Sequence, residues 1–224
     1  MSLDIEGIGM TSQRARDRLA TALLEMGIQS EPILDVIRRI PRHFFIDEAL
    51  ASRAYENTAL PIGFNQTISQ PYIVAKMTEV LVKNKELENV LEIGTGCGYQ
   101  TVVMAQFAKY VYTVERIDGL LIRARERFQK LNCNNIRTKH SDGNIGWPAH
   151  SPYDGIIVAA APIGVPKALI EQLAVDGRLI IPVGEPGKQK LLLITRTEND
   201  YTEQYIDSVS FVPMLSGVNN SRKQ

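Results

Sequence analysis

The sequence predicts a single α/β domain built on a doubly wound, mostly parallel sheet with helices on both faces. Apolar strand segments alternate with helical segments from about residue 86 to residue 183, as in successive β–α–β units. A glycine-rich turn joins the first of these strands to the helix that follows it, over residues 94–98. Two further strands separated by polar turns close the chain, and they predict an antiparallel addition to the sheet.

Length and charge limit the classes of protein that fit. The chain has 224 residues, with 25 basic and 25 acidic side chains and a formal net charge of zero. That length is enough for a full hydrophobic core, and we expect one domain over residues 1–224. Within it, an N-terminal helical and loop region (about 11–85) precedes a ligand-binding α/β core (about 86–217). Because nucleic-acid binders usually carry a basic excess, we expect no nucleic-acid partner.

Cysteine and histidine usage argues against a metal site. Cys97, Cys133 and three scattered histidines form no metal-ligand spacing and no disulfide framework. The N-terminus contains Asp4 and Glu6 instead of a basic stretch followed by an apolar core. No apolar run approaches the roughly 20 residues of a membrane span. We therefore expect a cytoplasmic protein with no metal and no membrane partner.

The first 85 residues predict two helices, a long loop and a third helix. Leucines at helical spacing indicate a helix that ends at Gly27, and Ser30 with an early proline starts a second helix that ends at Pro41. Residues 55–72 show no regular pattern, and their mixture of small polar and apolar residues is typical of a functional loop. Ser69 is expected to be the N-cap of the third helix, to hold a carboxylate at that helix N-terminus, or to do both.

The segment after residue 88 predicts a ligand site. A short apolar strand (89–93) runs into the glycine turn, and a helix follows up to about residue 108. The pattern is Glu-x-Gly-x-Gly-x-Gly, and Tyr99 stands where a dinucleotide fingerprint has its third glycine. No Lys-Ser/Thr pair of a phosphate-binding loop follows. Glu92 lies beside the turn, where a negative charge suits a cationic ligand; a tight turn without a ligand is the alternative.

Two acidic residues at predicted strand ends extend this site. Glu115 ends a strand over residues 110–115, about 20 residues after the turn, where an acid accepts both ribose hydroxyls of an adenosine. Asp142 follows a short strand over residues 136–140 and can accept a hydrogen bond from the adenine amino group. An ordinary exposed glutamate and an ordinary Asp-Gly turn are the alternatives.

The remaining segments complete the sheet. The near-continuous apolar run over residues 153–161 predicts a central strand that is buried on both faces. The other elements are expected to be a helix that begins near Asp118, a helix at 166–173, and strands at 177–183, 190–196 and 205–211.

Several segments together resemble one enzyme family, the bacterial protein-L-isoaspartate O-methyltransferases. The glycine motif alone resembles the wider class I of S-adenosylmethionine-dependent methyltransferases. The Thr-Ile-Ser-Gln-Pro sequence is the specific part, because it belongs to this family's acceptor side. The similarity runs from about residue 11 to about residue 217, in the family's order, and its segments are 41–43, 59–63, 66–72, 90–96, 114–117, 142–143 and 211–213.

The resemblance implies a Rossmann-like class I methyltransferase fold with a permuted order of its final strands. It implies methyl transfer from S-adenosylmethionine to the free α-carboxyl of L-isoaspartyl residues in damaged proteins and peptides. The family's catalytic serine falls on Ser69. The implied cofactor-binding residues are Glu92, Gly94, Thr95, Gly96, Gly98, Glu115, Arg116, Asp142 and Gly143, and the implied substrate-binding residues are Asn57, Pro61, Ile68, Ser69 and Gln70.

The sequence departs from the family pattern in three places, which together contain four residues. Asn57 stands where the family usually has aspartate, and Phe64-Asn65 stands where it usually has His-Gly. Cys97 replaces a usual serine. The first two changes lie on the acceptor side, so we expect them to bear on acceptor preference or turnover and not on cofactor binding.

Other functions fit the sequence less well. Tyr99 disfavours a nicotinamide dehydrogenase. Zero net charge disfavours a nucleic-acid methyltransferase, as does Ala-Ala-Ala-Pro at residues 159–162 in place of Asn/Asp-Pro-Pro-Tyr. A methyltransferase that acts on another carboxylate, and a non-catalytic member that binds cofactor or damaged protein, both stay open.

A carboxylate acceptor is ionised at pH 7, so the reaction needs no strong base.

Overall fold

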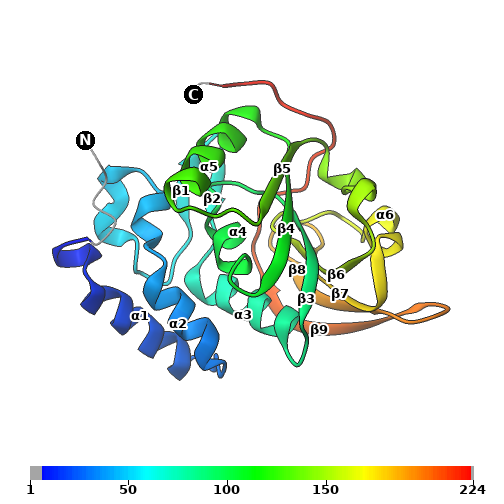
Figure 1. Ribbon diagram of the computed structural model, residues 1–224, viewed down its shortest axis with the longest axis horizontal. Coiled ribbons are helices and arrows are strands. Elements are labelled where there is room, and N and C mark those ends of the chain that lie inside the picture. Colours follow the sequence, from blue (N-terminus) through cyan, green and yellow to red (C-terminus); the bar gives the residue numbers. More distant parts are fainter. Residues whose placement is uncertain (1–6, 223–224) are drawn as a thin grey trace.

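A seven-stranded sheet forms the centre of the computed structural model, which describes residues 7–222 (Figure 1). The expectations about Asp4 and Glu6 lie outside these residues. The strand order is β5-β4-β3-β6-β7-β8-β9; β3 to β7 are parallel to one another, and β8 and β9 are antiparallel. The doubly wound sheet with an antiparallel addition is therefore confirmed. The strands are β3 Leu87–Ile93, β4 Ala108–Glu115, β5 Ile136–His140, β6 Tyr153–Val158, β7 Leu173–Val183, β8 Gln189–Arg196 and β9 Tyr201–Val209.

The order of the strands reverses at β3. The chain proceeds from β3 to β4 and β5 on one side, and then returns to place β6 and β7 on the other side. The carboxyl ends of β3 and β6 are neighbours, since Ile93 pairs with Val158. In open α/β sheets, ligands bind in the crevice at such a reversal. The glycine turn begins at this point.

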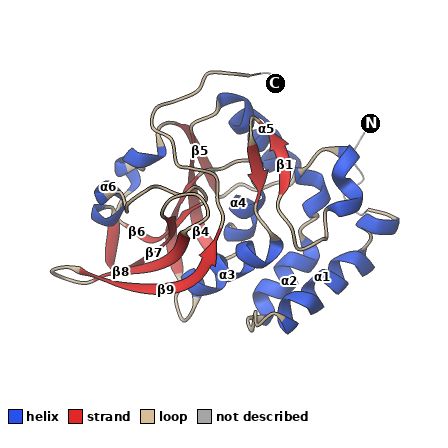
Figure 2. Cartoon of the chain, turned by 180° about the vertical axis from the view of Figure 1, so that it is seen from behind, coloured by secondary structure: helices blue, strands red, loops and turns tan. Residues whose placement is uncertain are grey.

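Helices cover both faces of the sheet, but unequally (Figures 1 and 2). One face carries α3, α4 and α5, with α1 and α2 packed outside α3, and all five helices share one buried cluster with the sheet. The other face carries the short α6, whose Leu169 belongs to a second buried cluster. The α-helices are α1 Gln13–Glu25, α2 Glu31–Arg39, α3 Pro71–Val82, α4 Tyr99–Met104, α5 Asp118–Lys130 and α6 Lys167–Glu171. Short 3-10 helices lie at Gly9–Thr11, Arg42–Phe45, Glu48–Arg53, Gly143–Ile145 and Pro148–His150.

The predicted irregular loop at residues 55–72 contains a β-hairpin, so this prediction was wrong. Strand β1 (Leu60–Gly63) pairs antiparallel with β2 (Gln66–Ile68). The two turn residues, Phe64 and Asn65, have φ angles of 53° and 55°. Turns of this type normally use Asn-Gly or Gly-Gly, because few side chains adopt a positive φ without strain. The Phe-Asn sequence therefore lacks the usual signal of a hairpin.

Burial of the Phe64 ring holds this strained turn against α5. The ring packs with Ile117 and Leu120 in a small buried cluster. The Arg123 guanidinium lies over the ring, 5.3 Å from its centroid. A Cβ atom on Gly119 would lie 2.5 Å from the ring tip, so only glycine leaves space for it. The hairpin is thus anchored on the helix that follows Glu115.

The start of α3 also differs from the expectation. Ser69 is not the N-cap of this helix; Gln70 occupies that position, directly before Pro71. The cap is supplied from elsewhere, because the Tyr72 N–H donates a hydrogen bond to Asn57 Oδ1 (2.9 Å). An amide oxygen satisfies a free N–H of the first helical turn as a serine hydroxyl would. The Ser69 side chain is therefore available for another function.

Two other predicted elements are shorter than expected. Helix α4 ends at Met104, because Ala108 already begins β4. The apolar run from residue 153 is a strand only up to Val158, and the residues after it turn into the crevice.

A fully buried acid lies on β3. Glu92 has 0% exposure, and its Oε2 accepts hydrogen bonds from Thr101 Oγ1 and Thr113 Oγ1, each at 2.5 Å. Its Oε1 has no hydrogen-bond partner within residues 7–222. Burial raises the pKa of Glu92 to about 8, although the two threonine hydroxyls oppose this shift. Glu92 is therefore mostly a neutral acid at pH 7.

This raised pKa predicts that Glu92→Gln alters how stability depends on pH. In the unfolded chain the carboxyl has a pKa of about 4.5, so between about pH 4.5 and 8 the folded state holds a proton that the unfolded state has lost. Wild-type stability should fall as pH rises through this window, by up to about 1.4 kcal/mol per pH unit, whereas glutamine does not titrate. Thermal unfolding at pH 5, 6.5 and 8 should show the Tm of the variant gaining on wild type as pH rises.

The matched control is Glu198→Gln, on the exposed turn between β8 and β9. It should shift Tm equally at all three pH values. A Glu92→Gln difference that is also independent of pH would show that Glu92 does not titrate in this window.

Candidate active site

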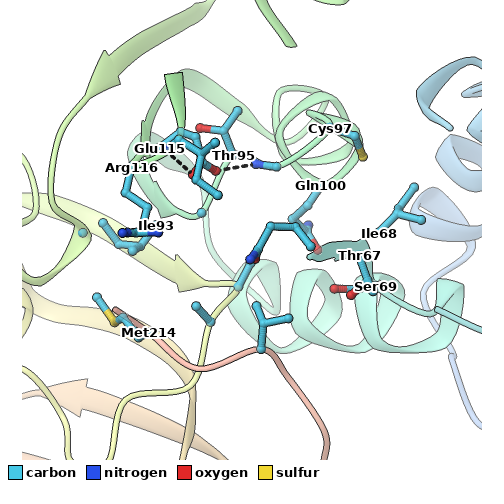
Figure 3. Close-up of a pocket in the computed structure, with 18 of the residues that line it drawn as sticks. Thr67, Ile68, Ser69, Ile93, Thr95, Cys97, Gln100, Glu115, Arg116 and Met214 are labelled. Carbon is cyan, nitrogen blue, oxygen red and sulfur yellow. Dashed lines mark hydrogen bonds between the residues drawn. The ribbon is translucent and has the colours of Figure 1, made fainter. Parts of the chain in front are cut away.

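The main pocket lies at the strand reversal, over the carboxyl ends of β3, β4 and β6 (Figure 3). Four segments far apart in the sequence form its walls: the glycine turn, the end of β4, the segment from β2 to α3, and a C-terminal segment. The residues that line it include Thr67, Ile68, Ser69, Gly94, Thr95, Gly96, Glu115, Arg116, Gly143, Ala159, Val212 and Met214.

The glycine turn forms the floor of the main pocket. Gly94, Gly96 and Gly98 have φ angles of 93°, 54° and 90°, in the region that favours glycine. Gly94 and Gly96 line the pocket. Gly98 does not, because it begins α4, and a Cβ atom there would lie 2.6 Å from the ring of Phe128. Gly98 is therefore needed for packing against α5, whereas the other two bring the backbone to the ligand.

Glu115 ties the turn to the end of β4. Its side chain is 5% exposed and lines the main pocket. The Gly96 N–H donates to Oε2 and the Ile117 N–H donates to Oε1, both at 2.9 Å. Burial raises the pKa of Glu115, and the two backbone N–H groups oppose this effect. A carboxylate has about four acceptor sites, so two remain for the hydroxyl groups of a ligand.

Ser69 lies on the opposite side of the main pocket from Arg116 and Met214 (Figure 3). It follows β2 and precedes α3, so the anchored hairpin fixes its position. Ser69 also lines a second cavity, which we call the side groove. The side groove is open to solvent and runs from the hairpin region to the β7–β8 turn and the end of β9. The two cavities share Thr67, Ser69, Ala159 and Val212.

A C-terminal strap, residues 209–222, closes the main pocket from above the strand ends. Its backbone pairs with Ala161, whose N–H donates to Val212 O and whose carbonyl accepts from Met214 N–H, both at 2.8 Å. The buried Gln189 clamps Phe211: its Nε2 donates to Phe211 O (3.0 Å), and its Oε1 accepts from Phe211 N–H (2.6 Å). The strap therefore joins the walls of both cavities.

The sequence analysis missed Gln189 and most of the strap. Neither segment contains a motif, and their contacts join residues more than 20 positions apart. Only the resemblance at residues 211–213 indicated that this part of the chain matters.

Asp142 is near the main pocket, and both oxygens of its carboxylate accept hydrogen bonds from the chain itself. Oδ1 accepts from the Asn144 N–H (2.8 Å), and Oδ2 accepts from the Gly217 N–H of the strap (2.6 Å). The Asp-Gly turn is present, and the neighbouring Gly143 lines the pocket while Asp142 does not. The Asp142 side chain thus holds the strap in this structure.

Three other predicted site residues lie outside the main pocket and the side groove. Glu92 points into the core behind the glycine turn, so it does not present a charge to a ligand. Asn57 caps α3. Pro61 is exposed on β1 and lines neither cavity. Ile68 and Gln70, in contrast, do lie at the cavities, one in each.

The described residues offer no metal site and no membrane span. No group of three or more His, Cys, Asp or Glu side chains could hold an ion anywhere in residues 7–222. In the same part of the chain, every helix is too short or too polar to cross a bilayer. Cys97 and Cys133 are both free thiols.

Comparisons with known sequences point to one family. The family model described as protein-L-isoaspartate(D-aspartate) O-methyltransferase matches residues 14–219. A protein-L-isoaspartate O-methyltransferase of Halorhodospira halophila is 56% identical over 211 residues, which cover 94% of this chain and 96% of the relative. The corresponding protein of Pseudomonas syringae pv. tomato is 56% identical over 208 residues, which cover 93% of this chain and 99% of the relative.

Solved structures agree with the sequence relatives. One protein-L-isoaspartate O-methyltransferase has a TM-score of 0.82 and 27% identity, covering 91% of this chain and 67% of the other. The Plasmodium falciparum protein described as a protein-L-isoaspartate O-methyltransferase, in complex with S-adenosyl-L-homocysteine, has a TM-score of 0.78 and 26% identity, covering 89% of this chain and 98% of the other. The fold and the resemblance are thereby confirmed, and the chain belongs to the protein-L-isoaspartate(D-aspartate) O-methyltransferase family.

Proposed function

We propose that this protein transfers a methyl group from S-adenosylmethionine to the free α-carboxyl of L-isoaspartyl residues in proteins and peptides. The observation that carries the proposal is the position of Ser69, where the main pocket meets the side groove. A methyltransferase needs one site for the methyl donor and one for the acceptor, joined at the reacting atoms. The family membership names the acceptor.

The main pocket fits an adenosine-containing methyl donor. Gly94 and Gly96 have no side chains, so a ligand can approach the backbone of the turn closely. A Cβ atom on Gly96 would contact only Ile62, at 3.4 Å, and would otherwise occupy the space of the pocket. We assign Glu115 to the ribose hydroxyls, the backbone of residues 94–96 to the methionine part, and Arg116 with Gly143 to the adenine side. When bound, S-adenosylmethionine supplies an electrophilic methyl group on a sulfonium ion. Glu92 acts on this site only through the core, because its neutral carboxyl faces away from it.

The chain's own residues provide positioning instead of proton transfer. An α-carboxyl has a pKa near 3.5 and is already ionised at pH 7, so no base is required. We assign Ser69 Oγ to donate a hydrogen bond to one carboxylate oxygen and so aim the other at the methyl group. The N-terminus of α3 follows at once, and its dipole favours a negative charge there. Correct orientation of this kind can contribute on the order of 7–11 kcal/mol.

The product explains how such a reaction initiates repair. Methoxide leaves the acyl carbon of a methyl ester far more readily than an oxygen leaves a carboxylate. The neighbouring backbone nitrogen therefore attacks this carbon, the C–O bond to the methoxy group breaks, methanol departs with the proton of the nitrogen, and a succinimide ring closes. Hydrolysis of that ring returns part of the material to normal aspartate. The protein is required only for the methyl transfer.

The same proposal covers partners and location. We assign isoaspartyl-containing proteins and peptides as partners, with no nucleic acid, membrane or metal, and we place the reaction in the cytoplasm. Zero net charge and the two free cysteines support this assignment. We treat residues 1–224 as one domain.

Two matched peptides test the proposed reaction. One contains isoaspartate and the other normal aspartate at the same position, and base-labile methyl incorporation from labelled S-adenosylmethionine is measured on both. We expect label on the isoaspartyl peptide only. Cofactor binding without label on either peptide would contradict the proposal and would favour a non-catalytic binder or another carboxylate acceptor.

Ser69→Ala and Glu115→Gln should separate the two halves of the site. Ser69→Ala should lower kcat roughly 10- to 100-fold and leave the cofactor Kd within about twofold, because the serine orients only the acceptor. Glu115→Gln should instead weaken cofactor binding about 10-fold, because a charged acceptor of hydrogen bonds is lost. Single-turnover kinetics and calorimetric cofactor titration measure the two effects. Turnover within twofold of wild type for Ser69→Ala would remove the serine from the mechanism.

The hairpin anchor should influence turnover through the placement of Ser69. Phe64→Gly accepts the positive φ but removes the ring from its cluster, so kcat should fall at least several-fold while the cofactor Kd changes little. Asn65→Gly relaxes the same turn and keeps the ring, so kcat should stay at the wild-type value. Both are assayed well below their measured Tm values. Equal kcat for the two variants would show that the anchor does not position the acceptor side.

A further inference from the structure

The side groove is positively charged, although the whole chain is neutral. Lys188 and Lys190 are the only charged residues that line it in the described part of the chain. Both lie on or beside the β7–β8 turn and are exposed. Neither forms an ion pair with any residue between 7 and 222. Two lysine charges are therefore available to a ligand in this groove.

Two acids close to the groove along the chain, Asp207 and Glu185, form no ion pair with either lysine. Asp207 lies on β9, but it is not part of the groove wall, and its Oδ1 accepts a hydrogen bond from the Ser208 N–H (2.8 Å). Glu185 lies in the same turn as Lys188 and is exposed without an ion pair to either lysine. The contact between the two residues is a hydrogen bond within the turn, from the backbone N–H of Lys188 to the backbone carbonyl of Glu185 (2.9 Å).

The lysines are carried by a fixed part of the backbone. Gln189 lies between them and is 3% exposed. Both ends of its amide group bond to the backbone of Phe211, which lines the same groove. This double hydrogen bond holds the β7–β8 turn to the strap, so the two backbone positions are set before a ligand arrives.

The rest of the groove suits an extended peptide. Its other side chains are hydroxyl, amide or apolar groups, which can bond to a peptide backbone or pack against side chains. They include Thr58, Gln70, Ile73, Ser208, Ser210 and Phe211.

The geometry separates the reacting carboxylate from the lysines. The carboxylate must lie where the two cavities meet, and the residues shared by both are Thr67, Ser69, Ala159 and Val212. Lys188 and Lys190 are not among them, so they face residues that flank the isoaspartate.

We propose that the side groove binds this flanking segment and selects acidic side chains in it through Lys188 and Lys190. The inference rests on the proposed function.

Peptide pairs test this selection. Each pair has isoaspartate at the centre and glutamate or glutamine at one of the three positions on either side. For at least one position, the kcat/KM of the wild-type protein should be roughly 2- to 10-fold higher for the glutamate peptide than for the glutamine peptide. The effect is small because exposed ion pairs are individually weak. It should appear mainly as a lower KM, because the lysines bind the flanking residues and do not contact the reacting carboxylate. The preference should shrink between 50 mM and 500 mM salt, because salt screens exposed charges.

Lys188→Gln/Lys190→Gln is the diagnostic variant, and Lys130→Gln, on α5 outside both cavities, is its control. The double variant should treat the glutamate and glutamine peptides alike, whereas the control should keep the preference. Equal kcat/KM at all six positions in wild type, or a preference that survives in the double variant, would overturn the inference. In either case normal methylation of the glutamine peptides would leave the proposed function intact. Failure to methylate any isoaspartyl peptide would overturn both.

Discussion

The organisation of the site depends on the Glu115 carboxylate. Its two oxygens accept the N–H groups of Gly96 and Ile117, so one side chain joins the glycine turn, the end of β4 and the start of α5. Burial of such a carboxylate is tolerated because each oxygen has a backbone partner. This link adds to two backbone hydrogen bonds that join the turn to β4, from the Gly94 N–H (2.8 Å) and the Thr95 N–H (3.4 Å) to Val114 O. The remaining walls of the main pocket are built against this frame.

Two segments from opposite ends of the chain complete the walls. The β1–β2 hairpin is anchored through Phe64 on α5, and its second strand brings Ser69 to the main pocket. The strap is anchored by Gln189 and Asp142, and it brings Met214 to the other side. Both anchors are side chains that do not need to touch a ligand. The distance across the site is therefore set by packing and hydrogen bonds outside it.

The sequence was sufficient for the doubly wound sheet with its antiparallel addition and for the position of Glu115 at the end of a strand beside the glycine turn, because these follow from local periodicity and from spacing along the chain. It was insufficient where the outcome depended on distant contacts. Glu92 is adjacent to the turn, but successive residues of a strand face opposite sides, and this one faces Thr101 and Thr113. The hairpin was hidden because Phe64 adopts a turn conformation that its side chain disfavours, and only packing against α5 compensates for it.

The charge of the side groove is another property that depends on which distant residues come together, and the composition of the chain does not reveal it. Zero net charge disfavours a general nucleic-acid binder, but a sum over 224 residues says nothing about one groove. Glu185 and Asp207, which are close to this groove along the chain, do not line it and form no ion pair with its lysines. Lys188 and Lys190 therefore give the side groove a local positive potential that composition cannot reveal. Because damaged sites occur in many sequence contexts, a field of this kind biases the choice among substrates without excluding any, which suits an enzyme whose acceptors share one altered residue and little else.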